Sequence, residues 1–140
     1  MEASGYRALV VDDEKILRQS AILALEREGF HCDEAGDGES AMAMLDQNVY
    51  DCIITDLRMP FKHGHQLAVE LLERPNCPVI VVVTGIIEPK LAKDLILRGV
   101  QDIVFKPANY GLMAAKVRAF VVRRREDEEA EAARLGVGTG

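Results

Sequence analysis

The sequence predicts an α/β fold, a single domain in which helices cover both faces of a parallel β-sheet. Five short apolar runs alternate with five amphipathic patterns along the chain, and this alternation is typical of α/β proteins. The run Val79–Val83 is β-branched, as expected of a strand that is buried on both faces of a parallel sheet. A length of 140 residues suits one domain of ordinary size.

The apolar runs define five expected strands, and the segments between them define five expected helices. Each helical segment repeats apolar residues at intervals of three or four, and Gly29 and Gly99 stand where two helices should stop. The strands are expected at Ala8–Val11, His31–Ala35, Cys52–Thr55, Val79–Val83 and Ile103–Phe105. The helices are expected at Glu14–Glu28, Glu39–Gln47, His65–Glu73, Glu88–Arg98 and Tyr110–Arg125.

The two ends of the chain differ in character from its middle. We expect residues 1–5 to be a flexible N-terminus and residues 6–124 to form the domain. Residues 125–140 are acidic and alanine-rich before a glycine-rich end, which predicts an acidic helix extension and a flexible tail. The apolar heptad positions of a coiled coil are missing there.

Composition argues against several classes of protein. The formal net charge of -6 disfavours direct nucleic-acid binding, because an acidic surface repels phosphates. No apolar run approaches the roughly 18 residues needed to span a bilayer, and the start is too short and acidic for a signal peptide. We therefore expect a cytoplasmic protein that does not bind membranes. The three cysteines include no CxxC pair, which predicts reduced thiols.

Polar residues follow four of the five expected strands. Asp12 and Asp13 follow the first strand, and Asp56 follows the third. Thr84 ends the fourth strand and Lys106 follows the fifth. Because sites in open α/β sheets lie at the carboxyl ends of the strands, we expect three carboxylates, one hydroxyl and one ammonium group around a small cleft.

Such a cluster favours a divalent cation together with an oxyanion. Neighbouring carboxylates repel one another, and Mg²⁺, which prefers oxygen ligands, removes the conflict. With Lys106 as a second positive group, the cluster suits a phosphoryl group that arrives with Mg²⁺. Asp56 can then act as a nucleophile and form an aspartyl phosphate. A lone acid after a strand is usually a cap or a solvated turn, so the prediction depends on the whole set.

At these positions the chain resembles the response-regulator receiver family of two-component signalling. The resemblance covers about residues 6–124 and implies a flavodoxin-like fold with five helices and strand order 2-1-3-4-5. It also implies a histidine kinase or histidine phosphotransfer protein as phosphodonor. A downstream effector, or an output domain that is absent here, would receive the signal. A homodimer through helix 4, strand 5 and helix 5 is a further expectation. The matching segments read VVDDEKILRQS, YDCIITDLRMPFKHG, VIVVVTG and GVQDIVFKP.

The resemblance implies a metal-binding and phosphoacceptor role for the residues after the first and third strands. Asp56 is the expected phosphorylation site and also a ligand of Mg²⁺. Asp13 is expected to bind the ion directly, and Asp12 mainly through water. The backbone carbonyl of Arg58 would complete the ligands that the protein supplies.

Other matching residues are expected to respond to the phosphoryl group or to leave room for it. Thr84 is the switch hydroxyl that bonds a phosphoryl oxygen, and Lys106 pairs first with the acidic cluster and then with that group. The resemblance implies a cis peptide between Lys106 and Pro107, which an X-Pro bond permits. Gly64 matches the turn after the phosphoacceptor, and Gly85 matches a small residue that admits the phosphodonor.

Several positions depart from the family pattern or extend it. Met59-Pro60 fits the turn, but His63 stands where an acidic residue is common. Ile103 replaces the aromatic residue that the family often has on the fifth strand, so we expect the signal to pass mainly through Thr84 and the loop that follows. Arg58 and Ile86 offer no base for a hydrolytic water, so we expect the phosphoryl group to persist for minutes or longer.

Alternative functions remain open at this point. A phosphatase of the haloacid-dehalogenase type also forms an aspartyl phosphate, but it places Asp-x-Asp after the first strand. A degenerate receiver would serve only as a binding module, and a receiver fragment would belong to a longer regulator. The segment Gly36–Ala41 fits a dinucleotide fingerprint, although a turn and helix start is the preferred interpretation. We expect no enzyme activity beyond slow autodephosphorylation.

Overall fold

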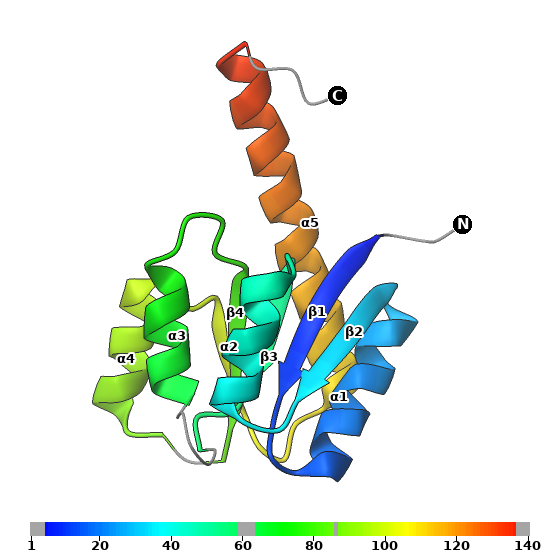
Figure 1. Ribbon diagram of the computed structural model, residues 1–140, viewed down its shortest axis with the longest axis vertical. Coiled ribbons are helices and arrows are strands. Elements are labelled where there is room, and N and C mark those ends of the chain that lie inside the picture. Colours follow the sequence, from blue (N-terminus) through cyan, green and yellow to red (C-terminus); the bar gives the residue numbers. More distant parts are fainter. Residues whose placement is uncertain (1–4, 59–63, 86, 137–140) are drawn as a thin grey trace.

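The computed structural model describes residues 5–58, 64–85 and 87–136, and its centre is a five-stranded parallel sheet (Figure 1). The strand order is β2-β1-β3-β4-β5, which confirms the predicted topology. The strands are β1 (Tyr6–Val11), β2 (Phe30–Ala35), β3 (Cys52–Thr55), β4 (Val79–Thr84) and β5 (Asp102–Phe105). The helices are α1 (Lys15–Arg27), α2 (Gly38–Gln47), α3 (Gly64–Leu72), α4 (Pro89–Arg98) and α5 (Tyr110–Arg134). The order reverses between β1 and β3, where sites in such sheets form.

Alternate residues of the strands build two separate cores, one on each face of the sheet. Ala8 and Val10 of β1 belong to the core under α1 and α5. Leu9 and Val11 belong to the core under α2, α3 and α4. This division follows from the period of two along a strand. Every residue of β4 is buried, as the β-branched run predicted.

Local sequence signals set four of the boundaries of the described helices. Gly29 and Gly99 end α1 and α4 with φ angles of 93° and 121°, which side chains with a Cβ rarely adopt. The Asp37 carboxylate accepts a hydrogen bond from the Ser40 N–H at 2.8 Å and caps α2. The glycine-containing segment before α2 is therefore a turn and a helix start, as preferred over the dinucleotide fingerprint. Asn109 caps α5 in the same way, through the N–H of Leu112.

Helix α5 is longer than the apolar periodicity predicted. The expected helix ended at Arg125 and led into an extension, and the structure has one continuous helix of 25 residues to Arg134. The last part of α5 extends past the sheet, at the end of the molecule opposite the carboxyl ends of the strands (Figure 1). Glu, Ala and Arg dominate this part of the sequence, and these are strong helix formers that need no buried face to favour a helix. None of the described helices is both long and apolar enough to cross a bilayer.

Asp51 and two arginines fasten the middle of α5 to the amino-terminal edge of the sheet. The Asp51 Oδ1 accepts hydrogen bonds from Arg125 at 2.7 and 3.2 Å, and its Oδ2 accepts from the Arg7 N–H at 2.8 Å. The Arg125 guanidinium also stacks 4.4 Å from the centre of the Tyr6 ring. Arg124 donates to the Cys77 carbonyl at 2.6 Å. We call Asp51, Arg124 and Arg125 the α5 brace.

Asp51→Ala should lower the free energy of unfolding by about 1–3 kcal/mol, because it leaves the Arg7 N–H and the Arg125 guanidinium without their acceptor. Asp46→Ala is the matched control, because it removes the exposed ion pair with Arg74, and exposed pairs contribute less than about 1 kcal/mol. Urea denaturation of both variants measures the difference. Equal effects would mean that the α5 brace contributes no more than a surface ion pair.

Candidate functional site

Three strand ends bring opposite charges together at the carboxyl edge of the sheet. Asp12 follows β1, Asp56 follows β3 and Lys106 follows β5. The Lys106 Nζ lies 3.0 Å from the Asp12 Oδ2 and 2.8 Å from the Asp56 Oδ2. The lysine thus bridges two carboxylates that are both largely buried. This is the cluster that the polar strand ends predicted.

The Asp56 carboxylate is held in one orientation by the backbone that follows it. Its Oδ1 accepts hydrogen bonds from the N–H groups of Leu57 at 2.6 Å and Arg58 at 3.2 Å. Its own N–H donates to the Val11 carbonyl at 3.0 Å. With Oδ2 on Lys106, both oxygens are fixed within a pocket where Asp56 is 6% exposed. A carboxylate that is held in this way has little conformational freedom left to lose when it binds a ligand.

Asp12 is a buried acid whose charge is only partly compensated. Burial raises its pKa, and the hydrogen bonds from the Glu14 N–H and from Lys106 partly oppose that shift. The nearby Asp56 adds to the rise. The Asp12 carbonyl accepts a 2.6 Å hydrogen bond from Arg18, which in turn pairs with Glu34. The site therefore carries an excess of negative charge that a cation would relieve.

Lys106 stays protonated in this setting. Burial alone would lower its pKa, but hydrogen bonds to Asp56 and Asp12 outweigh burial and raise the pKa above its ordinary value. A third acid, Glu14, lies 3.6 Å from the same ammonium group. The lysine is thus a positive charge held between the carboxylates of Asp12 and Asp56.

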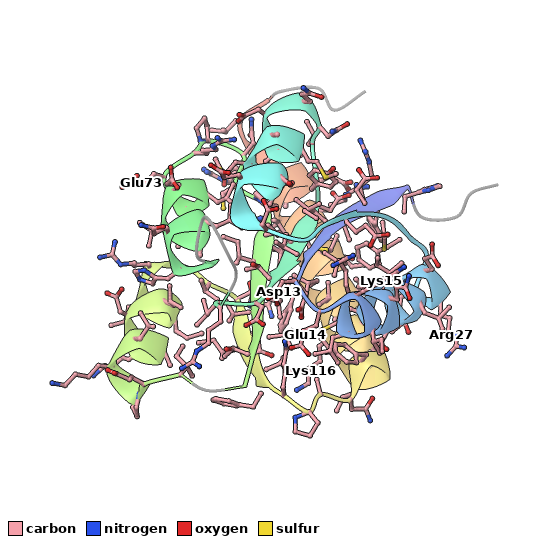
Figure 2. All side chains as sticks on the ribbon, turned by 60° about the horizontal axis from the view of Figure 1, so that its bottom comes forward. Asp13, Glu14, Lys15, Arg27, Glu73 and Lys116 are labelled. Atoms are coloured by element: carbon pink, nitrogen blue, oxygen red, sulfur yellow. The ribbon has the colours of Figure 1, made fainter. Side chains whose placement is uncertain are left out.

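The oxygens of four acidic side chains are close enough to share one metal ion. Asp12, Asp13, Glu14 and Asp56 each offer a carboxylate oxygen, and these atoms lie within 4.8 Å of one another. Asp13 and Glu14 are exposed at the mouth of the site, in the turn between β1 and α1 (Figure 2). Hard oxygen donors beside open solvent suit Mg²⁺, which keeps several waters. Asp13 was predicted as a metal ligand from the sequence, whereas Glu14 was not, although Asp12, Asp13 and Glu14 are three consecutive acids.

The remaining predicted residues lie at the same edge of the sheet. Thr84 ends β4 and is 1% exposed, and its carbonyl accepts from the Lys106 N–H at 2.9 Å. The N–H of Arg58 contacts Asp56, so its backbone borders the site. The Lys106–Pro107 peptide is cis, as the resemblance implied. The predictions for Met59-Pro60, His63 and Ile86 fall outside the described residues.

Gly64 lies against the backbone of Asp56 and Leu57. A Cβ placed on Gly64 would sit 1.9 Å from the Asp56 carbonyl oxygen and 2.9 Å from the Leu57 Cα. The Gly64 N–H donates to the Leu57 carbonyl at 3.2 Å. The start of α3 can therefore pack beneath Asp56 only where the residue has no side chain.

Comparison with known proteins assigns this arrangement to one family. The family model described as the response regulator receiver domain matches residues 8–118. Among solved structures, a CheY-like response regulator receiver domain protein from Methanospirillum hungatei has a TM-score of 0.82 at 20% identity. That match covers 89% of this chain and 99% of the other. A response regulator receiver protein from Pseudomonas putida has a TM-score of 0.74 at 29% identity, over 87% of this chain and 98% of the other.

Two relatives in sequence are longer regulators. The sensory transduction protein RegX3 of Mycolicibacterium smegmatis is 34% identical over 89% of this chain and 54% of its own length. The transcriptional regulatory protein SrrA of Staphylococcus aureus is 32% identical over 82% of this chain and 47% of its own length. This chain therefore spans about half the length of these relatives.

Gly64→Ala should lower the free energy of unfolding by about 1–3 kcal/mol or more, because the added methyl group meets backbone atoms that cannot rotate away. Gly85→Ala is the control, since a Cβ there meets nothing within 4 Å, and open surface substitutions usually change stability by less than about 0.5 kcal/mol. Thermal unfolding of both variants gives the comparison. A stable Gly64→Ala protein would mean that α3 can shift away from Asp56.

Proposed function

The chain belongs to the response regulator receiver domain family, and on this basis we propose that Asp56 is the residue that accepts a phosphoryl group. The proposal is supported above all by the Lys106 bridge between Asp12 and Asp56. A buried carboxylate with a fixed orientation, a permanent cation and neighbouring acids is what an aspartyl-phosphate site requires. The proposed donor is the phosphohistidine of a kinase or a phosphotransfer protein.

The transfer exchanges one bond to phosphorus for another. A carboxylate oxygen of Asp56 attacks the phosphorus atom, and a bond between Asp oxygen and phosphorus forms. The bond between phosphorus and the donor's imidazole nitrogen breaks, and that nitrogen keeps the electron pair and takes up a proton. Lys106 lies beside the attacking group and stabilises negative charge on the phosphoryl oxygens. No oxidant or further reactant is needed.

Receiver domains bind Mg²⁺ at an acidic pocket, and the residues here fit such an ion. We assign Asp13, Asp56 and the Arg58 carbonyl as direct ligands and Asp12 as a ligand through water. This assignment is supported by the proximity of the carboxylate oxygens of Asp12, Asp13 and Asp56, which lie within 4.8 Å of one another. When bound, Mg²⁺ neutralises charge on the carboxylates and on the transferring group. Glu14, close to the same oxygens, adds to the attraction for the ion.

The product of this chemistry is a modified state of the protein, which we propose is read by another domain or protein. Thr84, buried at the end of β4, is the proposed hydroxyl that turns toward the phosphoryl group. The matches cover only 54% and 47% of the relatives' own lengths, which supports an output domain or a separate effector as the reader. Hydrolysis of the aspartyl phosphate would be slow autodephosphorylation and not turnover of an outside substrate.

The surface and the thiols support two further parts of the proposal. Leu97 of α4, Phe105 of β5 and Leu112 of α5 are exposed apolar side chains, consistent with a homodimer through these three elements. All three cysteines are free thiols, as is usual in a reducing compartment, and we propose the cytoplasm. Residues 6–124 are the proposed receiver, with residues 125–140 as an appended segment.

Incubation with acetyl phosphate and Mg²⁺ should add the mass of one phosphoryl group to the protein, and Asp56→Asn should show no such adduct. EDTA should suppress the adduct in the parent, because the acidic cluster needs the ion before it can accept another anion. Intact-mass spectrometry gives both results. An adduct that survives in Asp56→Asn and in EDTA would place the modification elsewhere.

Asp13→Asn should weaken Mg²⁺ binding more than Asp12→Asn does. A change next to a ligand typically costs about 10–100-fold in affinity, and loss of a direct ligand should cost at least as much. Asp12→Asn is the matched control, because it removes one charge from the same cluster but keeps the proposed direct ligands. Calorimetric titration with Mg²⁺ measures both affinities, and the reverse order would contradict the ligand assignment.

A further inference from the structure

Tyr110 connects the acidic site to helix α5. It is the first residue of α5 and lies four residues after Lys106. Its ring is half-buried against the core between the sheet, α1 and α5. Asn109 caps the helix immediately before it, so the position of the ring and that of the first helical turn are tied together.

A small cavity lies between Tyr110 and the phosphoacceptor position. Its volume is about 10 Å³, and its polar lining includes Asp12, Thr55 and Asp56. Leu17, Ala21 and Val83 are among the apolar residues that line it, and among the residues that the structure describes Tyr110 is the one aromatic side chain of the lining. The ring therefore shares a confined space with both bridged carboxylates.

The charged groups of the site act directly on the Tyr110 phenol. Burial raises its pKa, Lys106 opposes the rise, and Asp12, Asp56 and Glu14 add to it. A change in the charge of the site therefore changes the environment of this ring. Ile103, which replaces the usual aromatic of strand 5, packs on the opposite face of the sheet with the core of α2, α3 and α4.

We propose that Tyr110 couples the phosphorylation state of Asp56 to the first turn of α5. This inference rests on the proposed function of Asp56. A phosphoryl group adds volume and charge beside the cavity and competes for Lys106, which now bridges Asp12 and Asp56. The Tyr110 ring must repack in response, and it carries the helix backbone with it because it is part of the first turn. Tyr110 acts as a positioning residue and not as a participant in phosphoryl transfer.

Helix α5 suits this role because it is continuous and held at a second point. It runs from Tyr110 at the site to Arg134 beyond the far edge of the sheet. The α5 brace holds it near Arg125. A shift of the first turn is therefore transmitted along the helix toward its exposed C-terminal end. This helix lies on the face of the sheet covered by α1 and α5, whereas Ile103 packs on the other face.

Fluorine NMR on the intact chain tests the coupling without a substitution. The chain has three tyrosines and no tryptophan, so uniform 3-fluorotyrosine labelling gives one resonance each for Tyr6, Tyr50 and Tyr110. Addition of Mg²⁺ and beryllofluoride, a phosphoryl mimic, should move the Tyr110 resonance. The Tyr50 resonance should stay in place, because that ring stacks with Arg7 and its hydroxyl donates to Asp33 at the opposite edge of the sheet. Tyr6 is not a control, because its ring stacks with Arg125 of α5. An unmoved Tyr110 resonance on protein that has bound beryllofluoride would overturn the proposal.

Hydrogen exchange measures whether the ring carries the response to α5. In the parent, beryllofluoride with Mg²⁺ should change the exchange rates of amides in the first turns of α5. Tyr110→Leu keeps an apolar side chain but removes the ring and the hydroxyl, and it should reduce this change by about half or more. Tyr50→Phe is the control and should leave the change as in the parent. An undiminished response in Tyr110→Leu would overturn the coupling.

The outcomes for the site and for the coupling can be separated by mass. Acetyl phosphate should still label Tyr110→Leu, as it labels the parent, while the α5 response is reduced. A parent that takes no label would refute the proposed function of Asp56 and the coupling with it. A parent that takes the label while Tyr110 and α5 show no response would refute the coupling alone.

Discussion

The contact of Lys106 with Asp12 and Asp56 is the constraint on which the rest of the structure depends. Two carboxylates that are each 6% exposed cannot share a pocket without a cation, because an unpaired buried charge is strongly destabilising. The lysine reaches both because the parallel register brings the ends of β1, β3 and β5 to the same edge of the sheet. Val11 lies beside Thr55 and Thr55 beside Val82, while Thr84 lies beside Phe105, so that β5 ends two residues beyond β3. The strand order and the charge pairing therefore support each other.

This constraint also concentrates electrostatic repulsion at the edge of the sheet and not in the cores beside it. The two cores are apolar and closed, whereas the edge between them holds four acids around one lysine. Such an excess of like charge is what makes the site receptive to a divalent ion, since binding removes a repulsion that folding created. Part of the stability of the metal-free domain is thus given up for affinity, as is common at functional sites.

Much of the fold and the centre of the site could be predicted from sequence because their signals are local. A β-branched run such as Val79–Val83 predicts a buried strand, and polar residues that follow strands predict a site at the carboxyl edge of the sheet. Features that depend on distant packing were missed. The Asp51–Arg125 pair joins residues 74 positions apart, and no local pattern reports it. Tyr110 was predicted only as the start of a helix, because its proximity to Asp12 and Asp56 depends on how α5 packs against the sheet. The part of α5 after Arg125 was predicted only as an acidic extension, without a defined end, because a solvent-exposed helix has no apolar periodicity.

The α5 brace divides the long helix into two arms of unequal length on either side of a pivot point at Arg125. At 1.5 Å per residue, the arm from Tyr110 to Arg125 is about 22 Å long and the arm from Arg125 to Arg134 about 13 Å. If the first turn shifts as proposed, a stiff helix held at Arg125 would tilt about that point, and its far end would move in the opposite sense to its near end by roughly 0.6 of the distance. A domain joined after Arg134 would then receive a displacement that is smaller than that of Tyr110 and opposite in direction, but with a larger force, because the second arm is shorter.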